Sequence, residues 1–286
     1  MLEQDGYPAG VPCYIDIEQP DPEAATEFYG GLFGWEFEDR VPADLPDHYF
    51  AARLGGRDVA GIGSQQPGSP PPQWLTYIAV DSADATAAAV RAAGGRVLVE
   101  PLDVFDAGRM AVCADPQGAV FCLWQANQHK GAAIVNAPGT WNWSDLKTRD
   151  VDGAKAFYGA VFGWEPSTVQ FGELEAVMWR RPGYGDALAP LDPGIRDRHD
   201  DAGVPVGFAD AIGWLMEMTS DEFPDDAPPH WAVTFAVDGT DEVADRAAQL
   251  GGTVVVAPFD IGPTRLATLR DPQGATFSVS SYAPER

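Results

Sequence analysis

Two aspartates are the side chains in this sequence best placed to do chemistry. Asp16 lies in the apolar segment CYIDI and Asp145 in the apolar segment WNWSDL. They are equivalent, since 145 − 16 = 129 and the blocks FYGGLFGWEF and FYGAVFGWEP start 157 − 28 = 129 residues apart. A carboxylate on an apolar strand needs a partner. That partner is either a backbone or arginine group with a structural role, or a substrate for which the carboxylate is a general base or hydrogen-bond acceptor.

Lys147 follows Asp145 by two residues and suggests an ion pair in the second half, whereas Glu18 takes the equivalent place in the first. His230 follows two prolines at a strand entrance. It is either a polar entrance residue or a pocket acid or base, because histidine titrates near neutral pH. His129, in the connection between the halves, and His199, in a loop, are both expected to be solvated.

Arg109 and Arg265 are a second equivalent pair, since 265 − 109 = 156. Each stands before a segment that leads into a D-P-Q-G turn. One interpretation is a structural pairing with an acid. The alternative is an arginine clamp on an anionic substrate.

The repeat covers both halves of the 286-residue chain. Asp115-Pro116-Gln117-Gly118 recurs at 271–274, an offset of 271 − 115 = 156, so the second half holds 156 − 129 = 27 extra residues. They are assigned to the Gly-, Pro- and Asp-rich stretch 182–207, which predicts a long surface loop. We expect domains at 8–127 and 138–284, the second carrying this insertion, joined by a linker at 126–139.

Each half divides again into two modules. Every quarter has an apolar strand, an Ala-rich helix and further strands, and each D-P-Q-G block has the residues of a type I turn that closes a hairpin. Asp21 and Pro22 are predicted to begin the first helix. The fold class predicted is therefore α+β, with tandem βαβββ modules. Module one is expected to pair either with module two or in a crossed arrangement.

This order of elements, the F-Y…L-F-G-W blocks and the D-P-Q-G blocks resemble the vicinal oxygen chelate superfamily of glyoxalases, bleomycin-resistance proteins and dioxygenases. W-x-D-L at 143–146 is similar to a tandem actinobacterial subgroup described as hydroxylase-like or antigen-like. The resemblance implies two cupped-sheet domains and covers nearly the whole chain outside 182–207. It leaves the reaction open, because one scaffold hosts many chemistries.

The resemblance also implies where a divalent metal would bind. Metal-dependent members use His, Gln or Glu on the first strand of each module and Glu on late strands. The matching positions here are Tyr14, Leu75, Cys122, Trp143, Ala232 and Ser278. None is His, Gln or Glu, so no cofactor is expected; a metal remains conceivable only in the first half, with Tyr14, Asp16 and Cys122 as its first candidates.

Side chains along a strand alternate between its two faces, so residues two positions away from these share the same pocket face. The predicted catalytic residues are Asp16, Asp145 and His230. The predicted substrate-binding residues are Tyr14, Tyr77, Trp124, Trp143, Lys147 and Ser278. The FGW aromatics are predicted to be helix-to-sheet core instead.

The amino-acid composition limits the classes of partner that the protein is expected to bind. The chain carries 43 acidic and 18 basic residues, a formal charge of −25. Phosphate backbones and anionic membranes both need cations, so neither nucleic acid nor membrane is expected as a partner. Three cysteines without C-x-x-C spacing favour a reducing compartment and buried thiols. With no signal-peptide pattern, a cytoplasmic monomer with an internal pseudo-dimer is expected.

Three functions stay open from the sequence. The first is a protein that binds a small planar or aromatic molecule in a metal-free pocket. The second is an enzyme, a glyoxalase-like lyase or a hydroxylase or dioxygenase, with a metal in the first domain or an aspartate base. The third is recognition by a partner through the 182–207 loop. No G-x-G-x-x-G, P-loop or G-x-S-x-G motif supports a dinucleotide, phosphoryl-transfer or hydrolase function.

Overall fold

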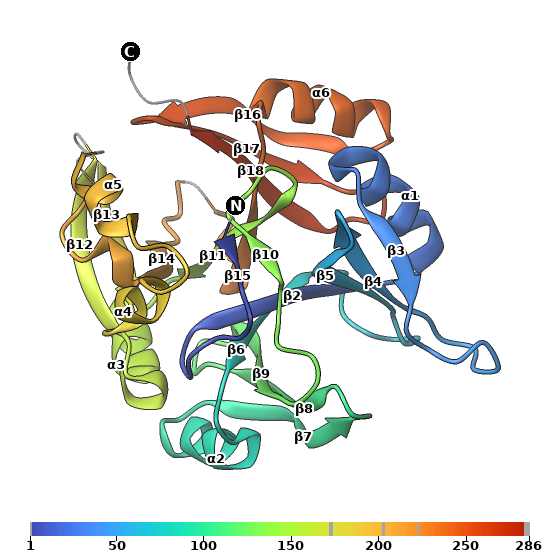
Figure 1. Ribbon diagram of the computed structural model, residues 1–286, viewed down its shortest axis with the longest axis horizontal. Coiled ribbons are helices and arrows are strands. Elements are labelled where there is room, and N and C mark those ends of the chain that lie inside the picture. The colour runs from blue at the N-terminus through green and yellow to red at the C-terminus, as the bar shows by residue number, and fades with distance from the viewer. Residues whose placement is uncertain (1, 172–173, 202–203, 222, 283–286) are drawn as a thin grey trace.

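The computed structural model contains four βαβββ modules in a row (Figure 1). It describes residues 2–171, 174–201, 204–221 and 223–282. Module one is β2 (Pro12–Gln19), α1 (Pro22–Phe33), β3 (Glu36–Asp39), β4 (Tyr49–Leu54) and β5 (Arg57–Ser64). Module two is β6 (Trp74–Ala79), α2 (Ala83–Ala92), β7 (Arg96–Val104), β8 (Gly108–Ala114) and β9 (Val120–Ala126).

The second half repeats this plan. Module three is β11 (Thr140–Thr148), α3 (Val151–Phe162), β12 (Glu165–Phe171), β13 (Leu174–Arg180) and β14 (Ala211–Glu217). Module four is β15 (His230–Ala236), α6 (Thr240–Gln249), β16 (Thr253–Ile261), β17 (Thr264–Arg270) and β18 (Thr276–Tyr282). A short pair, β1 (Leu2–Glu3) and β10 (Ile134–Val135), ties the N-terminus to the linker.

Modules one and two form one eight-stranded mixed sheet, in the order β3-β4-β5-β2-β6-β9-β8-β7. Modules three and four form the second, in the order β12-β13-β14-β11-β15-β18-β17-β16. The first strand of each half lies at the centre of its sheet, antiparallel to the first strand of the next module. The predicted fold class is thereby confirmed, and the uncrossed pairing of modules is the one that occurs.

Local signals in the sequence fix the ends of the elements. Asp21 begins α1, where its side chain accepts a hydrogen bond from the Ala24 N–H, and Gly34 ends it with a positive φ of 73°. Asp115 closes the β8–β9 turn as predicted, because its Oδ1 accepts from the N–H groups of residues 117, 118 and 119. These bonds satisfy turn donors that strand pairing leaves free.

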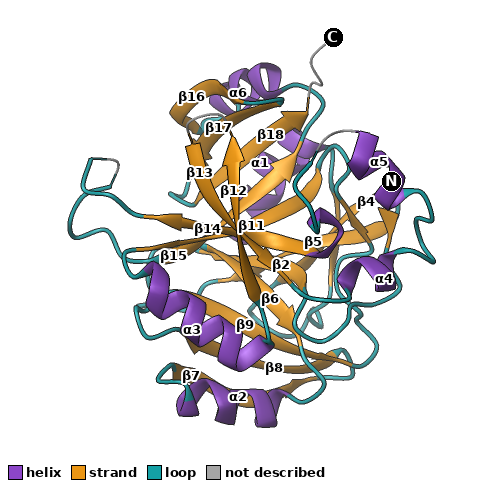
Figure 2. Cartoon of the chain, turned by 90° about the vertical axis from the view of Figure 1, so that its left-hand side faces the viewer, coloured by secondary structure: helices purple, strands orange, loops and turns teal. Residues whose placement is uncertain are grey.

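The two halves pack together because the first helix of each half lies against the other half. Figure 2 shows α3 beside α2 of the first half, and α1 lies near α6 of the second half in Figure 1. The ring centroids of Phe33 of α1 and Phe235 are 4.8 Å apart, and those of Phe162 of α3 and Phe121 are 5.8 Å apart. The FGW aromatics are core, as predicted: the Trp35 and Trp164 indole N–H groups donate to backbone carbonyls of the opposite half.

Buried hydrogen bonds also cross the interface between the two halves. The Tyr29 hydroxyl donates to Asp271 at 2.9 Å, and the Tyr158 hydroxyl donates to Asp115 at 3.3 Å. Each D-P-Q-G aspartate thus closes its own turn and also holds the first helix of the other half. Between the backs of the sheets, the Thr76 and Ser144 hydroxyls are 2.7 Å apart.

The insertion is more structured than the surface loop that the sequence predicts. It connects β13 to β14, where β4 and β5 of the first half are joined by a two-residue turn. Its described residues form α4 (Tyr184–Leu188), α5 (Ile195–Asp201) and a 3₁₀ turn at Phe208–Asp210. Residues 202–203 of the insertion and the expected domain end at 284 lie outside the described residues. Among the described helices, none has the length and apolar character needed to span a bilayer.

Candidate functional site

Each curved sheet has an inner face, and the two inner faces differ. We call the inner face around Asp16 the first cup and the inner face around Asp145 the second cup. In the first cup the aromatic side chains of Tyr14, Tyr77 and Trp124 are 4%, 6% and 5% exposed. The first cup is therefore filled by its own side chains.

Asp16 is the polar centre of the first cup. Its Oδ2 accepts hydrogen bonds from the Tyr77 hydroxyl at 2.8 Å and from the Tyr49 hydroxyl at 3.1 Å. Gly61 makes this possible, because a Cβ there would lie 2.2 Å from the Tyr49 hydroxyl oxygen. Burial raises the pKa of Asp16 to about 7 against the two hydroxyl donors, which lower it.

His129 completes the filling of the first cup. Its ring lies 4.6 Å from the Tyr14 ring and 5.7 Å from the Trp124 ring, and the Trp124 indole donates to the His129 carbonyl at 2.9 Å. The expectation that His129 is solvated is wrong. The linker folds back over the first cup, and burial lowers the pKa of the imidazole.

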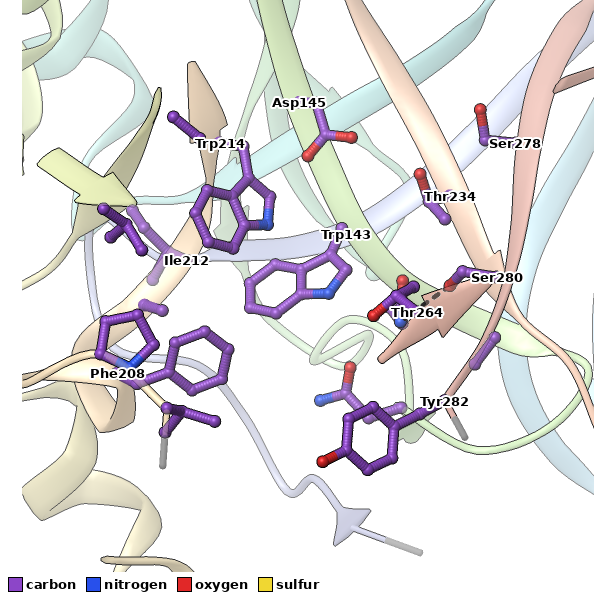
Figure 3. A pocket seen from close by; sticks show the side chains of 18 of the residues that line it. Trp143, Asp145, Phe208, Ile212, Trp214, Thr234, Thr264, Ser278, Ser280 and Tyr282 are labelled. Carbon is purple, nitrogen blue, oxygen red and sulfur yellow. Dashed lines mark hydrogen bonds between the residues drawn. The ribbon is translucent and has the colours of Figure 1, made fainter. Parts of the chain in front are cut away.

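The second cup is hollow. A cavity of about 1920 Å³ borders it (Figure 3). Trp143 lies near the centre, between Trp214 and Phe208 on one side and the hydroxyls of β15 and β18 on the other. The Trp143 ring centroid is 6.0 Å from that of Trp214 and 5.9 Å from that of Phe208. One wall is thus flat and aromatic and the other is hydroxyl-bearing.

The register of the strands explains why one cup is full and the other hollow. Asp16 pairs with Gly61, and Asp145 pairs with Trp214, so Gly61 and Trp214 are equivalent. The same pairing scheme identifies three positions at which a first-cup ring becomes a small second-cup residue: Tyr49 to Ala176, Tyr77 to Thr234 and Trp124 to Ser280. Relative to the first cup, the second cup therefore lacks three large rings and has one additional ring, that of Trp214.

The insertion forms an outer wall of this cavity. Leu188 of α4, Ile195 of α5 and Phe208 line it. His199, which the sequence predicts to be solvated, also lines the cavity, with its ring centroid 5.1 Å from that of Phe208. That prediction is wrong because a Gly- and Pro-rich composition does not show that short helices fold back onto a neighbouring sheet.

Asp145 borders the second cup, and its carboxyl group resembles that of Asp16 in two respects. Its Oδ1 is buried without a hydrogen-bond partner. Burial raises its pKa to about 7, against the nearby charge of Lys147, the Thr234 hydroxyl and the backbone N–H of Trp214, which lower it. A carboxyl group poised near neutral pH can accept a hydrogen bond or a proton from a bound molecule.

Lys147 lines the cavity without the close ion pair that the sequence suggests. Its Nζ lies 5.4 Å from the Phe223 ring centroid. Among the ion pairs between described residues, none joins Lys147 to Asp145 within 4.0 Å. Its charge acts on the Asp145 carboxyl group at longer range.

The remaining predicted site residues fall into two groups. Ser278 faces the cavity beside Thr234, with which it is paired. His230 lies at the edge of the sheet opposite Lys147 and is not part of the cavity wall; its Nδ1 is 3.0 Å from the Pro228 carbonyl oxygen, and burial lowers its pKa. It matches the strand-entrance interpretation better than a pocket acid or base.

Arg109 and Arg265 take the structural role. Arg109 bridges Asp84 and Asp103, with contacts of 2.8 Å and 2.9 Å. Arg265 bridges Asp241 and Asp260 in the same manner. Neither lines the cavity, so neither clamps a ligand there.

The residues at the superfamily's metal positions do not fit a divalent metal. In the second cup the predicted metal positions hold Trp143, Ala232 and Ser278, and the register places Thr234 rather than Ala232 opposite Trp143. None of these is one of the imidazole or carboxylate ligands that such metals prefer. In the first cup, burial raises the pKa of both Tyr14 and Cys122 above their ordinary values, and each must lose its proton to bind a metal. Within the described residues, no group of three His, Cys, Asp or Glu side chains could hold a metal ion.

Four residues that lie in or beside the cups are not predicted from the sequence to be there: Tyr49, His129, Phe208 and Trp214. Tyr49 lies on β4, two strands away from the central strand β2, and Trp214 lies on β14, after the 27-residue insertion that changes the offset between the halves. His129 and Phe208 lie in connections, whose positions no periodicity predicts. A tryptophan within the apolar segment AIGWLME, at 211–217, is the one signal that could have placed a ring on this face.

Two cupped mixed sheets, each built from two βαβββ modules, define the class of the protein. The model of the Glyoxalase/Bleomycin resistance protein/Dioxygenase superfamily matches residues 14–123 and 141–279, and the chain belongs to this superfamily.

Relatives align along the whole chain. A Mycobacterium tuberculosis protein named "Putative glyoxylase CFP32" is 38% identical over 293 residues, with 100% of both chains covered. The anthracycline biosynthesis protein DnrV of Streptomyces peucetius is 33% identical over 287 residues, covering 96% of this chain and 94% of the relative.

Solved structures show the same fold. The Mn(II)-bound glyoxalase from Novosphingobium aromaticivorans superposes with a TM-score of 0.60 at 18% identity, covering 96% of this chain and 82% of that one. The 2,3-dioxygenase LapB from Pseudomonas superposes with a TM-score of 0.60 at 13% identity, covering 96% and 93%. At these identities the likeness concerns the fold alone.

Proposed function

We propose that the protein binds a planar or aromatic small molecule in the second cup, without a metal. The observation that carries the proposal is the contrast between a filled first cup and a cavity of about 1920 Å³ at the equivalent face of the second. Ligand sites are concave, mostly apolar and fitted with a few polar groups. Trp143 supplies the flat surface, and Asp145 and Lys147 face the polar edge of the ligand.

Two further observations support a flat ligand. Trp143 stands at a position where metal-dependent relatives place a ligand, so stacking replaces coordination there. The Streptomyces peucetius relative is named for anthracycline biosynthesis, and anthracyclines contain fused flat rings. A cavity of this size accommodates several fused rings.

The test is a thermal-shift and fluorescence screen of planar aromatic metabolites, repeated on Trp143→Ala. Losing a central aromatic anchor typically costs about 2 kcal/mol or more of binding. Hits that bind wild type and variant equally would show that the site is wrong. Metal-dependent turnover of methylglyoxal–thiol adducts would replace this proposal with the glyoxalase-like lyase.

A metal-independent proton transfer is a second candidate, because the Asp145 carboxyl group borders the cavity and its pKa is raised to about 7. In that reaction Asp145 removes a proton from a carbon atom of the bound molecule and later returns one. Mass spectrometry of a screening hit after incubation in D₂O tests it. Deuterium incorporation that Asp145→Asn abolishes supports the enzyme, and no incorporation leaves binding as the function.

A further inference from the structure

The first cup shows which groups donate hydrogen bonds to the aspartate at its centre. Asp16 Oδ2 accepts two phenolic O–H groups, from Tyr77 at 2.8 Å and from Tyr49 at 3.1 Å. Both phenol rings lie inside the cup, with the Tyr77 ring 6.0 Å from Tyr14 and 6.2 Å from Trp124. The protein therefore contains, in its own first half, an aspartate whose Oδ2 accepts two hydroxyaryl groups among aromatic rings.

The second cup keeps the aspartate and lacks both phenols. Thr234 stands at the position of Tyr77, and Ala176 at the position of Tyr49. The Thr234 hydroxyl reaches Asp145, but its side chain fills only a fraction of the space of a phenol ring. The Trp214 backbone N–H also donates to Asp145, but the Asp145 Oδ1 has no hydrogen-bond partner, and a buried acceptor that lacks a donor is costly.

We propose that the ligand of the second cup is a hydroxyaryl compound, a flat ring system whose phenolic O–H donates to the Asp145 carboxylate where the Tyr77 phenol stands in the first cup. This rests on the proposed function and names its ligand class. The rest of the ring system lies against Trp143, and the hydroxyls of Ser278 and Ser280 face its other side (Figure 3).

The surrounding charges favour a neutral donor. The Lys147 ammonium group acts on Asp145 and would repel a cationic amine at the same place. An ionised Asp145 would in turn repel a carboxylate ligand. A phenol gives the carboxylate a proton donor without bringing a charge, and hydrogen bonds to charged groups are the strong ones.

The experiment compares phenols with their methyl ethers, which keep the ring system and lose the donor. The probes are 2-naphthol with 2-methoxynaphthalene and 2-hydroxyphenanthrene with 2-methoxyphenanthrene. Titrations at about pH 7.5, where Asp145 is largely ionised and these phenols are neutral, give the four dissociation constants. We expect each phenol to bind wild type about tenfold more tightly than its ether, the usual effect of one hydrogen bond to a charged group.

Two substitutions locate the donor's partner. Asp145→Leu should reduce the preference for phenol over ether to about twofold or less, whereas Asp16→Asn, at the equivalent position of the filled cup, should leave it unchanged. If circular dichroism shows that Asp145→Leu is unfolded, Asp145→Asn takes its place, with a partial loss of preference expected because the neutral amide oxygen is a weaker acceptor.

A third substitution introduces the residue type of Tyr77 at the equivalent position of the second cup, Thr234. Thr234→Tyr places a phenol beside Asp145 and should abolish binding of all four probes, while Asp16→Asn, at the equivalent position of the filled cup, should retain it. Phenols and ethers that bind wild type equally would overturn the ligand class and leave the proposed function standing. Failure of every probe to bind folded wild type would overturn both.

Discussion

The two cups share strand order, register and a central aspartate, and they differ in what surrounds that aspartate. Rings occupy the first cup, while small side chains replace them in the second: Ala176, Thr234 and Ser280. The linker adds His129 to the first cup, and the insertion adds Phe208 to the rim of the second. The comparison shows that the same arrangement of strands gives one cup filled by its own side chains and one that borders a cavity.

The largest effect is expected from separating the cups. Helix α1 packs on Phe235 and Phe277 of the second half, and α3 packs on Phe121 of the first. Residues 1–131 and 132–286 expressed alone would each expose an apolar sheet face and should fail to fold, whereas co-expression should restore a folded complex. Circular dichroism and size-exclusion chromatography measure this. A cooperative thermal transition in either isolated half would show that the cups are independent.

Equivalent substitutions on the two central strands should have opposite effects. Trp143→Ala truncates a cavity wall and should weaken binding of a planar ligand about tenfold or more with little change in Tm. Tyr14→Ala removes a ring that is 4% exposed and should cost about 3 kcal/mol of stability without changing ligand affinity of the folded protein. Thermal denaturation and fluorescence titration of both variants provide the two readouts. The same profile for both variants would remove the distinction between the cups.

Titration of Asp16 gives an effect of intermediate size. Burial raises its pKa to about 7 from 3.8, so between these values the folded state binds a proton that the unfolded state has released. Stability from this group is therefore lost as pH rises from about 4 to 7. Asp16→Asn removes the titration, and the stability of the variant relative to wild type should increase by about 2–3 kcal/mol between about pH 5 and pH 8. A pH-independent difference in urea denaturation would contradict the raised pKa.

The smallest effect concerns one hydrogen bond of the filled cup. Tyr49→Phe removes a donor to Asp16 and keeps the ring, so we expect a loss of about 1 kcal/mol in stability above pH 7, where the carboxylate is ionised. Ligand affinity should not change, because Ala176 occupies the equivalent place in the second cup. Denaturant unfolding measures the first expectation. A change in ligand affinity would show that the two cups communicate.

The fold could be predicted well because its signals in the sequence are local and repeated. Asp21 and the D-P-Q-G turns specify where elements end, and the 129-residue offset is enough to make Asp16 and Asp145 equivalent. Alternation along strands also places Tyr14 and Trp143 on inner faces. These inferences need only short-range periodicity and the repeat.

The occupancy of the cups could not be predicted in the same way. Whether Asp16 is covered depends on Tyr49, 33 residues away, and on His129 from the linker. Trp214 lies after an insertion that breaks the repeat. Such contacts depend on the register between distant strands and on the return path of loops, which leave no periodic signal in a single sequence.

The most direct test of the central claim is a crystal structure of the full-length chain soaked with 2-hydroxyphenanthrene. The account predicts one molecule in the second cup, its ring against Trp143 and its oxygen within hydrogen-bond distance of Asp145, with the first cup still filled by Tyr49 and Tyr77. Ligand density in the first cup, or at a site away from Trp143, would contradict the account.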